Sequence, residues 1–126
     1  MVQDRNEKLI LWFEELDKND IPLVGGKNAN LGEMLNAKIP VPPGFAITAY
    51  AYKQFITETG IAEKIYKMIT DTVKDVNNPA EYEEASKKIR KLIDTTKMPK
   101  KIAKEIQNAY TALGKKTKQT NTFVAV

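Results

Sequence analysis

The chain has 126 residues, about the size of one domain, and 42% of them are hydrophobic, as in an ordinary globular protein. It contains neither cysteine nor histidine, which excludes disulfide bonds, thiolate metal sites and an imidazole base or phosphoryl carrier within the sequence. The net charge of +4 is unevenly divided, because residues 1–86 carry 9 basic and 14 acidic side chains and residues 87–126 carry 11 and 2.

No stretch reaches the roughly 18 uninterrupted apolar residues of a membrane span, and MVQDRNEK lacks the apolar centre of a signal peptide. We therefore expect a cytoplasmic protein without a membrane partner. The basic C-terminal third suits nucleic acid, phosphates or an acidic protein surface. A lysine-rich run without interleaved aromatic residues is more typical of a solvated helix face, so we expect no specific nucleic-acid partner.

The first predicted element is a buried strand over KLILWFEEL, residues 8–16, which is dense in β-branched and aromatic residues. Turn residues and an extended segment around Pro22 follow. Two glycines and a lysine, Gly25, Gly26 and Lys27, come next, and the apolar residues after them recur at helical spacing. The sequence thus predicts that this glycine–lysine motif opens a helix.

The run IPVPPGF, residues 39–45, has three prolines and predicts a rigid, extended backbone. Pro42, Pro43 and Gly44 are expected to fix the direction of the chain rather than to touch a substrate. A short strand, Phe45–Ile47, follows.

Helices make up most of what remains. Thr48 is a suitable N-cap for a helix that stops at Gly60, and another begins at Ile61. Asn78, with a proline after it, caps the next helix. The last helix is predicted to open at Pro99 and to close at Gly114.

The chain ends on NTFVAV, in which residues 123–126 predict a further strand. An apolar strand at the very end would leave an unpaired edge, so we expect residues 1–126 to be the N-terminal portion of a domain that is truncated at its C-terminal end. The predicted fold class is α+β, with a few strands covered by about five helices.

The glycine–lysine motif has two interpretations from its residues alone. It is neither a Walker A loop, because Ile21 and Asn28 stand where glycine and serine or threonine are required, nor a G-x-G-x-x-G fingerprint. Residues without Cβ let backbone N–H groups approach a ligand, and a helix start and Lys27 add positive charge, which suits phosphate. A simple turn with an exposed lysine explains the same residues.

The longer pattern LILWFEELDKNDIPLVGGKNANLGEMLNAKIPVPPGFAITAYAYKQF, residues 9–55, resembles the opening of the dikinase family that includes phosphoenolpyruvate synthase, pyruvate, phosphate dikinase and the rifampin phosphotransferases. GGK, a short amphipathic helix, and then PVPPGF with a threonine form the signature, and WFEEL and VGGKNA are similar to the synthase branch. Lys38 departs from it, because relatives usually have glycine there, directly after the helix, and we therefore expect a left-handed backbone conformation at this lysine.

The resemblance implies part of an ATP-grasp-like nucleotide-binding domain in which Lys27 contacts the ATP phosphates and Gly25 and Gly26 shape the loop. It also implies a parent enzyme that converts ATP, pyruvate and water to AMP, phosphoenolpyruvate and phosphate, with Mg²⁺ accompanying the nucleotide. The carrier histidine, the magnesium ligands and the pyruvate site would belong to the rest of the parent polypeptide. No catalytic residue and no metal ligand are assigned within residues 1–126.

Two functions therefore stay open at this point. The first is an ATP-binding fragment of a pyruvate-phosphorylating enzyme, which by itself is expected to be inactive. The alternative is a stand-alone, non-catalytic module of the same origin that binds anions or proteins.

Overall fold

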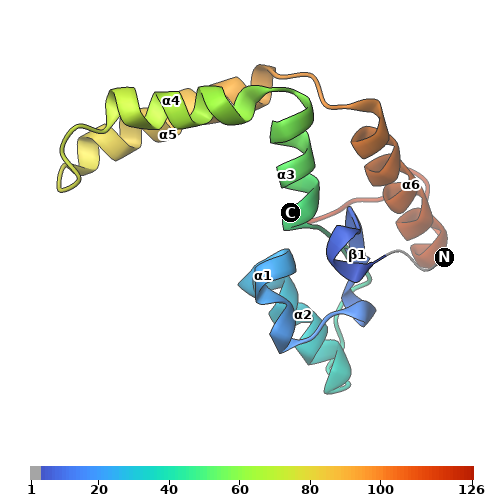
Figure 1. Ribbon diagram of the computed structural model, residues 1–126. Coiled ribbons are helices and arrows are strands. Elements are labelled where there is room, and N and C mark those ends of the chain that lie inside the picture. Colours follow the sequence, from blue (N-terminus) through green and yellow to red (C-terminus); the bar gives the residue numbers. More distant parts are fainter. Residues whose placement is uncertain (1–3) are drawn as a thin grey trace. The chain divides into compact units, whose positions relative to one another are not determined.

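The structure is a computed structural model that describes residues 4–126 and divides into two compact units (Figure 1). The first unit combines the residues up to Lys53 with those from Lys100 onward, and the second is Gln54–Pro99. Helix α3 (Ala49–Glu58) contains the boundary. Among the helices of the described residues, none combines the length and apolar character that a membrane span requires.

The first unit is built around a two-stranded antiparallel sheet of β1 (Ile10–Trp12) and β2 (Phe45–Ile47). Leu11 lies opposite Ala46, and both are buried, whereas the residues on either side of them are more exposed. The sheet therefore has one core-facing side, as expected from the two-residue period of a strand.

The first strand is shorter than the sequence predicts, so the prediction of a strand over residues 8–16 is wrong at both ends. After Trp12 the chain turns into a 3-10 helix, η2 (Phe13–Glu15). The Glu15 carboxylate accepts a hydrogen bond from the Trp12 backbone N–H at 2.8 Å, which closes this turn. The Phe13 N–H donates to the Gly44 carbonyl at 3.1 Å. One local and one long-range hydrogen bond thus end the strand earlier than its apolar pattern predicts.

Two helices, α1 (Ile21–Val24) and α2 (Gly26–Asn36), follow the 3-10 helix η3 (Lys18–Asp20). The expected extended segment around Pro22 is instead α1, because a proline in the first turn of a helix lacks only an N–H that would have no intrahelical partner there. The core of this part of the unit consists of five buried residues from β1, β2, α1, α2 and the segment before η3: Leu11, Leu16, Val24, Ala29 and Ala46.

Helix α6 (Lys100–Thr117) packs beside β1 in the same unit. The predicted end at Gly114 is wrong, since the helix continues to Thr117 and is followed by Lys118 with a φ of 56°. Gly114 is buried where the chain folds back over the helix, and a Cβ there would lie 2.8 Å from the Gln119 carbonyl oxygen. Close packing, and not helix termination, explains this glycine.

The predicted C-terminal strand is also wrong, because residues 123–126 form no strand and Phe123 is 98% exposed. A strand needs the backbone hydrogen bonds of a neighbour, and β1 and β2 pair only with each other among the described residues. The segment just before is held, since the Tyr110 hydroxyl donates to the Thr122 carbonyl at 2.7 Å.

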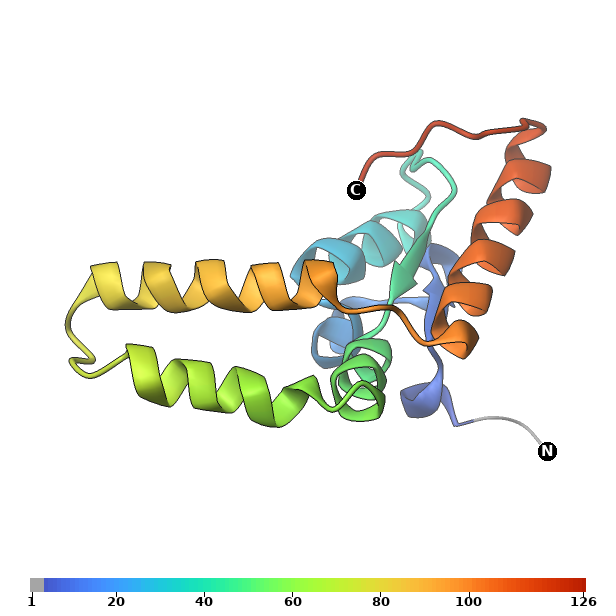
Figure 2. The ribbon, with the colours of Figure 1, turned by 90° about the horizontal axis from the view of Figure 1, so that it is seen from above.

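The second unit is a helical hairpin of α4 (Ile61–Thr72) and α5 (Pro79–Thr95), which run side by side (Figure 2). Both helices begin where the sequence predicts. Gly60 precedes α4 with a φ of 74°, and the Asn78 side chain accepts a hydrogen bond from the Ala80 N–H at 3.1 Å, which caps α5. The Glu81 carboxylate accepts from the Lys74 N–H at 2.9 Å, which ties the connecting loop to α5.

The described residues thus contain six α-helices, three 3-10 turns and a two-stranded sheet. This content agrees with an α+β class. The sequence predicted five helices because α1 was taken for an extended segment, and it predicted one strand too many.

Candidate phosphate-binding site

The glycine–lysine motif lies at the junction between α1 and α2. Gly25 has a φ of 83°, a conformation that favours glycine, and it separates the two helices. Val24 before it and Ala29 after it are both buried in the core. The Asn28 side-chain amide donates to the Val24 carbonyl at 2.9 Å, so the junction is anchored on both sides.

Helix α2 begins with backbone N–H groups that have no acceptor among the described residues. Ala29 is the first residue whose N–H bonds back, to the Gly25 carbonyl at 3.1 Å, and Gly25 has no side chain with which to cap the helix. The N–H groups of Gly26, Lys27 and Asn28 are therefore available, as at helix starts that bind anions. The Lys27 side chain is exposed and makes no hydrogen bond or ion pair with the described residues.

The physical reason for having glycine differs from one glycine position of the chain to another. An added Cβ at Gly32 would lie 2.5 Å from the Leu16 Cβ, and one at Gly44 would meet the Phe13 ring. At Gly26, by contrast, the backbone does not have a positive φ, and an added Cβ would have nothing within 4 Å of it. Neither packing nor backbone conformation in the described fold requires a glycine at position 26, which leaves close approach of a ligand as a physical reason for it.

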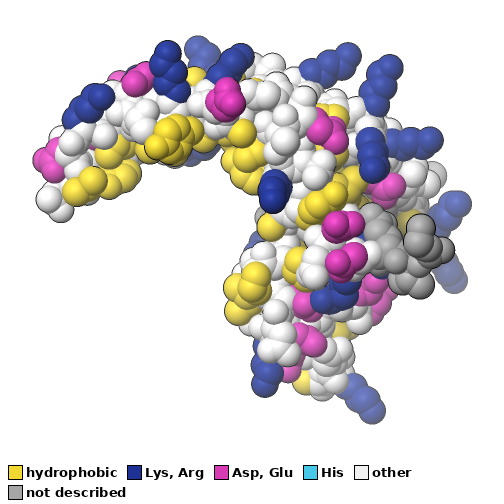
Figure 3. Space-filling model, viewed as in Figure 1, with side chains coloured by type: hydrophobic (Ala, Val, Ile, Leu, Met, Phe, Trp, Pro, Cys, Tyr) yellow, Lys and Arg dark blue, Asp and Glu magenta, His cyan; other side chains and the backbone are white. Residues whose placement is uncertain are grey.

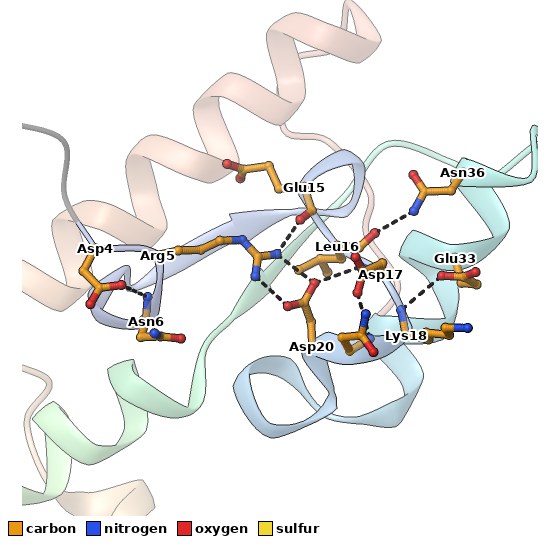
Figure 4. Close-up of polar contacts among 11 residues, drawn as sticks. Asp4, Arg5, Asn6, Glu15, Leu16, Asp17, Lys18, Asp20, Glu33 and Asn36 are labelled. Atoms are coloured by element: carbon orange, nitrogen blue, oxygen red, sulfur yellow. Dashed lines mark hydrogen bonds and ion pairs between the residues drawn. The ribbon is translucent and has the colours of Figure 1, made fainter.

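The segment before the motif is held by an ion-pair network that sequence reasoning missed (Figure 4). The Arg5 guanidinium binds both carboxylate oxygens of Asp20, the second at 2.7 Å, and also donates to the Glu15 carbonyl. Asp20 accepts in addition from the Asp17 N–H at 2.8 Å and is only 4% exposed. The sequence signal was the spacing of Asp17 and Asp20, which is that of a capping box.

The hydrogen bond from Arg5 lowers the pKa of Asp20, and its effect exceeds that of burial, which acts in the opposite direction. Asp20 directly precedes α1, so its hydrogen-bonded carboxylate holds in place the segment that leads into α1 and the glycine–lysine motif. On the other side, the Asn36 amide donates to the Leu16 carbonyl at 3.2 Å, and the Glu33 carboxylate accepts from the Lys18 N–H at 3.1 Å (Figure 4).

The aromatic and acidic residues around β1 have partners within the fold. The Trp12 ring meets Phe45 edge to face at 5.3 Å and carries the Lys116 ammonium 3.9 Å from its centroid. Lys116 also donates to Glu14 at 2.8 Å, which lowers the pKa of that carboxyl group. These contacts tie α6 to β1 and give Trp12 and Glu14 structural roles.

Two further sequence expectations can be placed on the structure. Lys38, which stands where the dikinase family usually has glycine, has a φ of 61°, so the backbone conformation expected there is present. As for metal ligands, no three or more acidic side chains of residues 4–126 lie together in a group that could hold a metal ion.

Comparisons of the sequence with family models and with known proteins indicate the same family. Residues 21–126 match the family described as pyruvate phosphate dikinase, AMP/ATP-binding domain. The chain is 50% identical over 112 residues to a probable phosphoenolpyruvate synthase of Staphylothermus marinus, which covers 89% of this chain and 13% of that protein. It is 49% identical over 107 residues to the phosphoenolpyruvate synthase of Aeropyrum pernix, covering 85% and 13% respectively.

A third relative is the phosphoenolpyruvate synthase of Synechocystis, 43% identical over 133 residues, which cover 99% of this chain and 16% of the relative. The chain thus spans less than a fifth of the length of each of these relatives. With a family match over most of its residues and identities near one half, the chain belongs to the pyruvate phosphate dikinase AMP/ATP-binding domain family.

Proposed function

We propose that this chain supplies the phosphate-contacting start of an ATP-binding domain in an enzyme of the phosphoenolpyruvate synthase type. The observation that carries the proposal is the open helix start at Gly25, Gly26 and Lys27, in a chain that belongs to an AMP/ATP-binding domain family. An ATP-grasp-like architecture for the complete domain and a cytoplasmic location are parts of the same proposal.

Each residue of the motif has a distinct role in this proposal. Gly25 sets the turn, and Gly26 keeps the surface low enough for phosphate oxygens to reach the N–H groups of α2. Lys27 places a full positive charge beside them. Phosphoryl transfer depends mainly on positioning and on neutralising charge in the transition state, which these groups can provide. Mg²⁺ would arrive with the nucleotide, and no described residue is assigned to it.

The proposed reaction is the one that the resemblance to the dikinase family implies: ATP, pyruvate and water give AMP, phosphoenolpyruvate and phosphate. In this proposal residues 1–126 are the N-terminal portion of the nucleotide-binding domain. Pyruvate would be bound by other domains of the parent polypeptide. By itself the 126-residue chain is expected to bind ATP weakly, because one lysine and three amides do not enclose a nucleotide.

A chimeric enzyme tests the proposal. The matching segment of the Aeropyrum pernix phosphoenolpyruvate synthase is replaced by this chain, and pyruvate-dependent AMP formation is measured. Lys27→Ala should lower the rate by about two to four orders of magnitude, an assumed range for removing one charged contact from the developing phosphoryl charge. Gly26→Ala should also lower it, since the added methyl group occupies the approach to the amides.

Lys18→Ala is the matched control, because Lys18 is an exposed lysine of the same unit and only its backbone N–H is used. Its chimera should keep full activity. A folded chimera that remains equally active with Lys27→Ala and Gly26→Ala would remove the motif from phosphate binding. If the chimera without further substitutions folds but is inactive, the result would favour the alternative, a non-catalytic module that binds anions or proteins.

A further inference from the structure

The junction between α1 and α2 interrupts what would otherwise be one continuous helix over residues 21–36. Gly25, with a φ of 83°, is the single residue between the two helices. In a continuous helix the backbone N–H of Asn28 would donate to the Val24 carbonyl, four residues earlier. In the structure the Asn28 side-chain amide donates to this carbonyl at 2.9 Å. The side chain of Asn28 thus takes the place of its own backbone N–H.

This exchange of donors satisfies the Val24 carbonyl without using a backbone N–H of α2. Val24 is only 8% exposed, and a carbonyl without a donor in such a buried segment costs free energy. Because the Asn28 side chain supplies the donor, the N–H groups of Gly26, Lys27 and Asn28 keep no acceptor among the described residues. Closing the break would use all three, since each would bond to the carbonyl four residues before it.

A second asparagine in the chain shows the opposite use of the same side chain. At the start of α5 the Asn78 side chain accepts a hydrogen bond from the Ala80 N–H at 3.1 Å, so that helix start is capped from within the chain. The Asn28 side chain instead points back to the preceding helix and donates there. The start of α2 is therefore left open, whereas the start of α5 is closed.

Positive charge alone does not single out the glycine–lysine motif as the place for a phosphate. On the face drawn in Figure 3, lysine and arginine side chains are scattered over both units and do not gather in one patch. Lys27 is one of 20 lysine and arginine residues, so its charge is not distinctive. The three free N–H groups are directional donors, and whatever keeps them free decides how well a phosphate binds.

We propose that Asn28 is a positioning residue: its side-chain amide holds the break between α1 and α2 open and so keeps three N–H groups available for the phosphates of the nucleotide. This inference rests on the function proposed above. Gly25 permits the break through its positive φ, and Asn28 stabilises it by satisfying the Val24 carbonyl. Without that amide, the Asn28 backbone N–H is the nearest alternative donor, and α1 and α2 join.

Hydrogen exchange of the 126-residue chain, followed by NMR, tests the structural half of the proposal without any ligand. In Asn28→Ala the backbone N–H of residue 28 should bond to the Val24 carbonyl, so its exchange with solvent should slow at least about tenfold relative to its intrinsic rate. The melting temperature should stay unchanged or rise, because alanine is the better helix former. Asn28→Gln keeps an amide donor and should exchange as the unaltered chain does.

Calorimetric titration of the chimeric enzyme tests the functional half. Asn28→Ala should weaken ATP binding at least about tenfold and leave adenosine binding unchanged, since only the phosphates meet the N–H groups. Asn28→Gln should bind ATP within about threefold of the chimera without further substitutions. Asn30→Ala is the matched control, because Asn30 is an exposed asparagine of the same helix, and it should change neither exchange nor binding.

The results separate this inference from the proposed function. If Lys27→Ala weakens ATP binding and Asn28→Ala does not, the phosphate site stands and the role of Asn28 is refuted. If neither substitution weakens ATP binding in a folded chimera, the phosphate site itself is wrong and the inference falls with it. A lower melting temperature of Asn28→Ala, with exchange at residue 28 as fast as before, would show that the side chain only supports packing, and would also overturn the proposal.

Discussion

Lys38 has a backbone φ of 61°, in the left-handed region where a side chain with a Cβ is disfavoured. Lys38→Gly should therefore raise the free energy of unfolding by about 0.5 to 1 kcal/mol, measured by chemical denaturation. Ala37→Gly is the matched control: Ala37 is the neighbouring residue with a φ of −82°, so glycine there should give no gain. Equal effects of the two substitutions would show that backbone strain at Lys38 is not relieved.

Asp20 joins the N-terminal segment to the start of α1, and its carboxylate accepts three hydrogen bonds, two from the Arg5 side chain and one from the Asp17 N–H. Asp20→Asn should destabilise the fold by about 1 to 3 kcal/mol, because it removes a charge-assisted pair from a buried position. Asp94→Asn, at an exposed position, should change stability by less than about 0.5 kcal/mol.

The same carboxyl group predicts an acid dependence. Its pKa in the folded protein lies below the ordinary value of 3.8, so its contribution to stability is present above that value and is lost as the pH falls through the folded-state pKa. The free energy of unfolding of the unaltered chain should therefore drop more steeply below about pH 4 than that of Asp20→Asn. Parallel pH profiles for the two proteins would contradict this account of the network.

The roles of single residues could be predicted from the sequence where they depend only on neighbouring residues of the chain. The N-cap at Thr48 is confirmed: its hydroxyl accepts from the Ala51 N–H at 3.1 Å. The left-handed conformation at Lys38 is likewise present. Asp20 was not recognised as a buried ion-pair partner because Arg5, its partner, is 15 residues away and nothing in the turn sequence indicates which distant side chain it meets.

At the scale of elements, Gly114 and Gly26 form a natural pair, because both are helical glycines and only one is packed. Gly114→Ala should destabilise the fold by about 1 to 3 kcal/mol despite the better helix propensity of alanine, since its methyl group would meet Gln119 and Thr122. Gly26→Ala should leave stability unchanged or raise it by up to about 1 kcal/mol. Thermal melts of both variants check this, and equal losses would refute the distinction between the two glycines.

Amphipathic helices were predicted well because a 3.6-residue period and capping residues are properties of contiguous sequence. The strand over residues 8–16 was overestimated, since its end depends on Glu15 and Gly44 closing a turn, and Gly44 is distant in sequence. The glycine–lysine motif was correctly placed at a helix start. The motif follows a helix, α1, instead of the expected extended segment.

At the scale of the whole molecule, the chain combines a small mixed unit that carries the candidate site with a helical hairpin. The α+β content and the family were predictable, because both follow from contiguous patterns. The packing of α6 beside β1 through Lys116, Trp12 and Glu14 was not, because residues about 100 positions apart meet there.

The central claim, that Lys27 and the amides beside it hold nucleotide phosphates, is tested most directly by calorimetric titration of the chimeric enzyme with ATP and, separately, with adenosine. Lys27→Ala should weaken ATP binding at least about tenfold, the loss expected for a hydrogen bond to a charged group, and leave adenosine binding unchanged. Unchanged affinity for ATP in a folded Lys27→Ala chimera would contradict the claim.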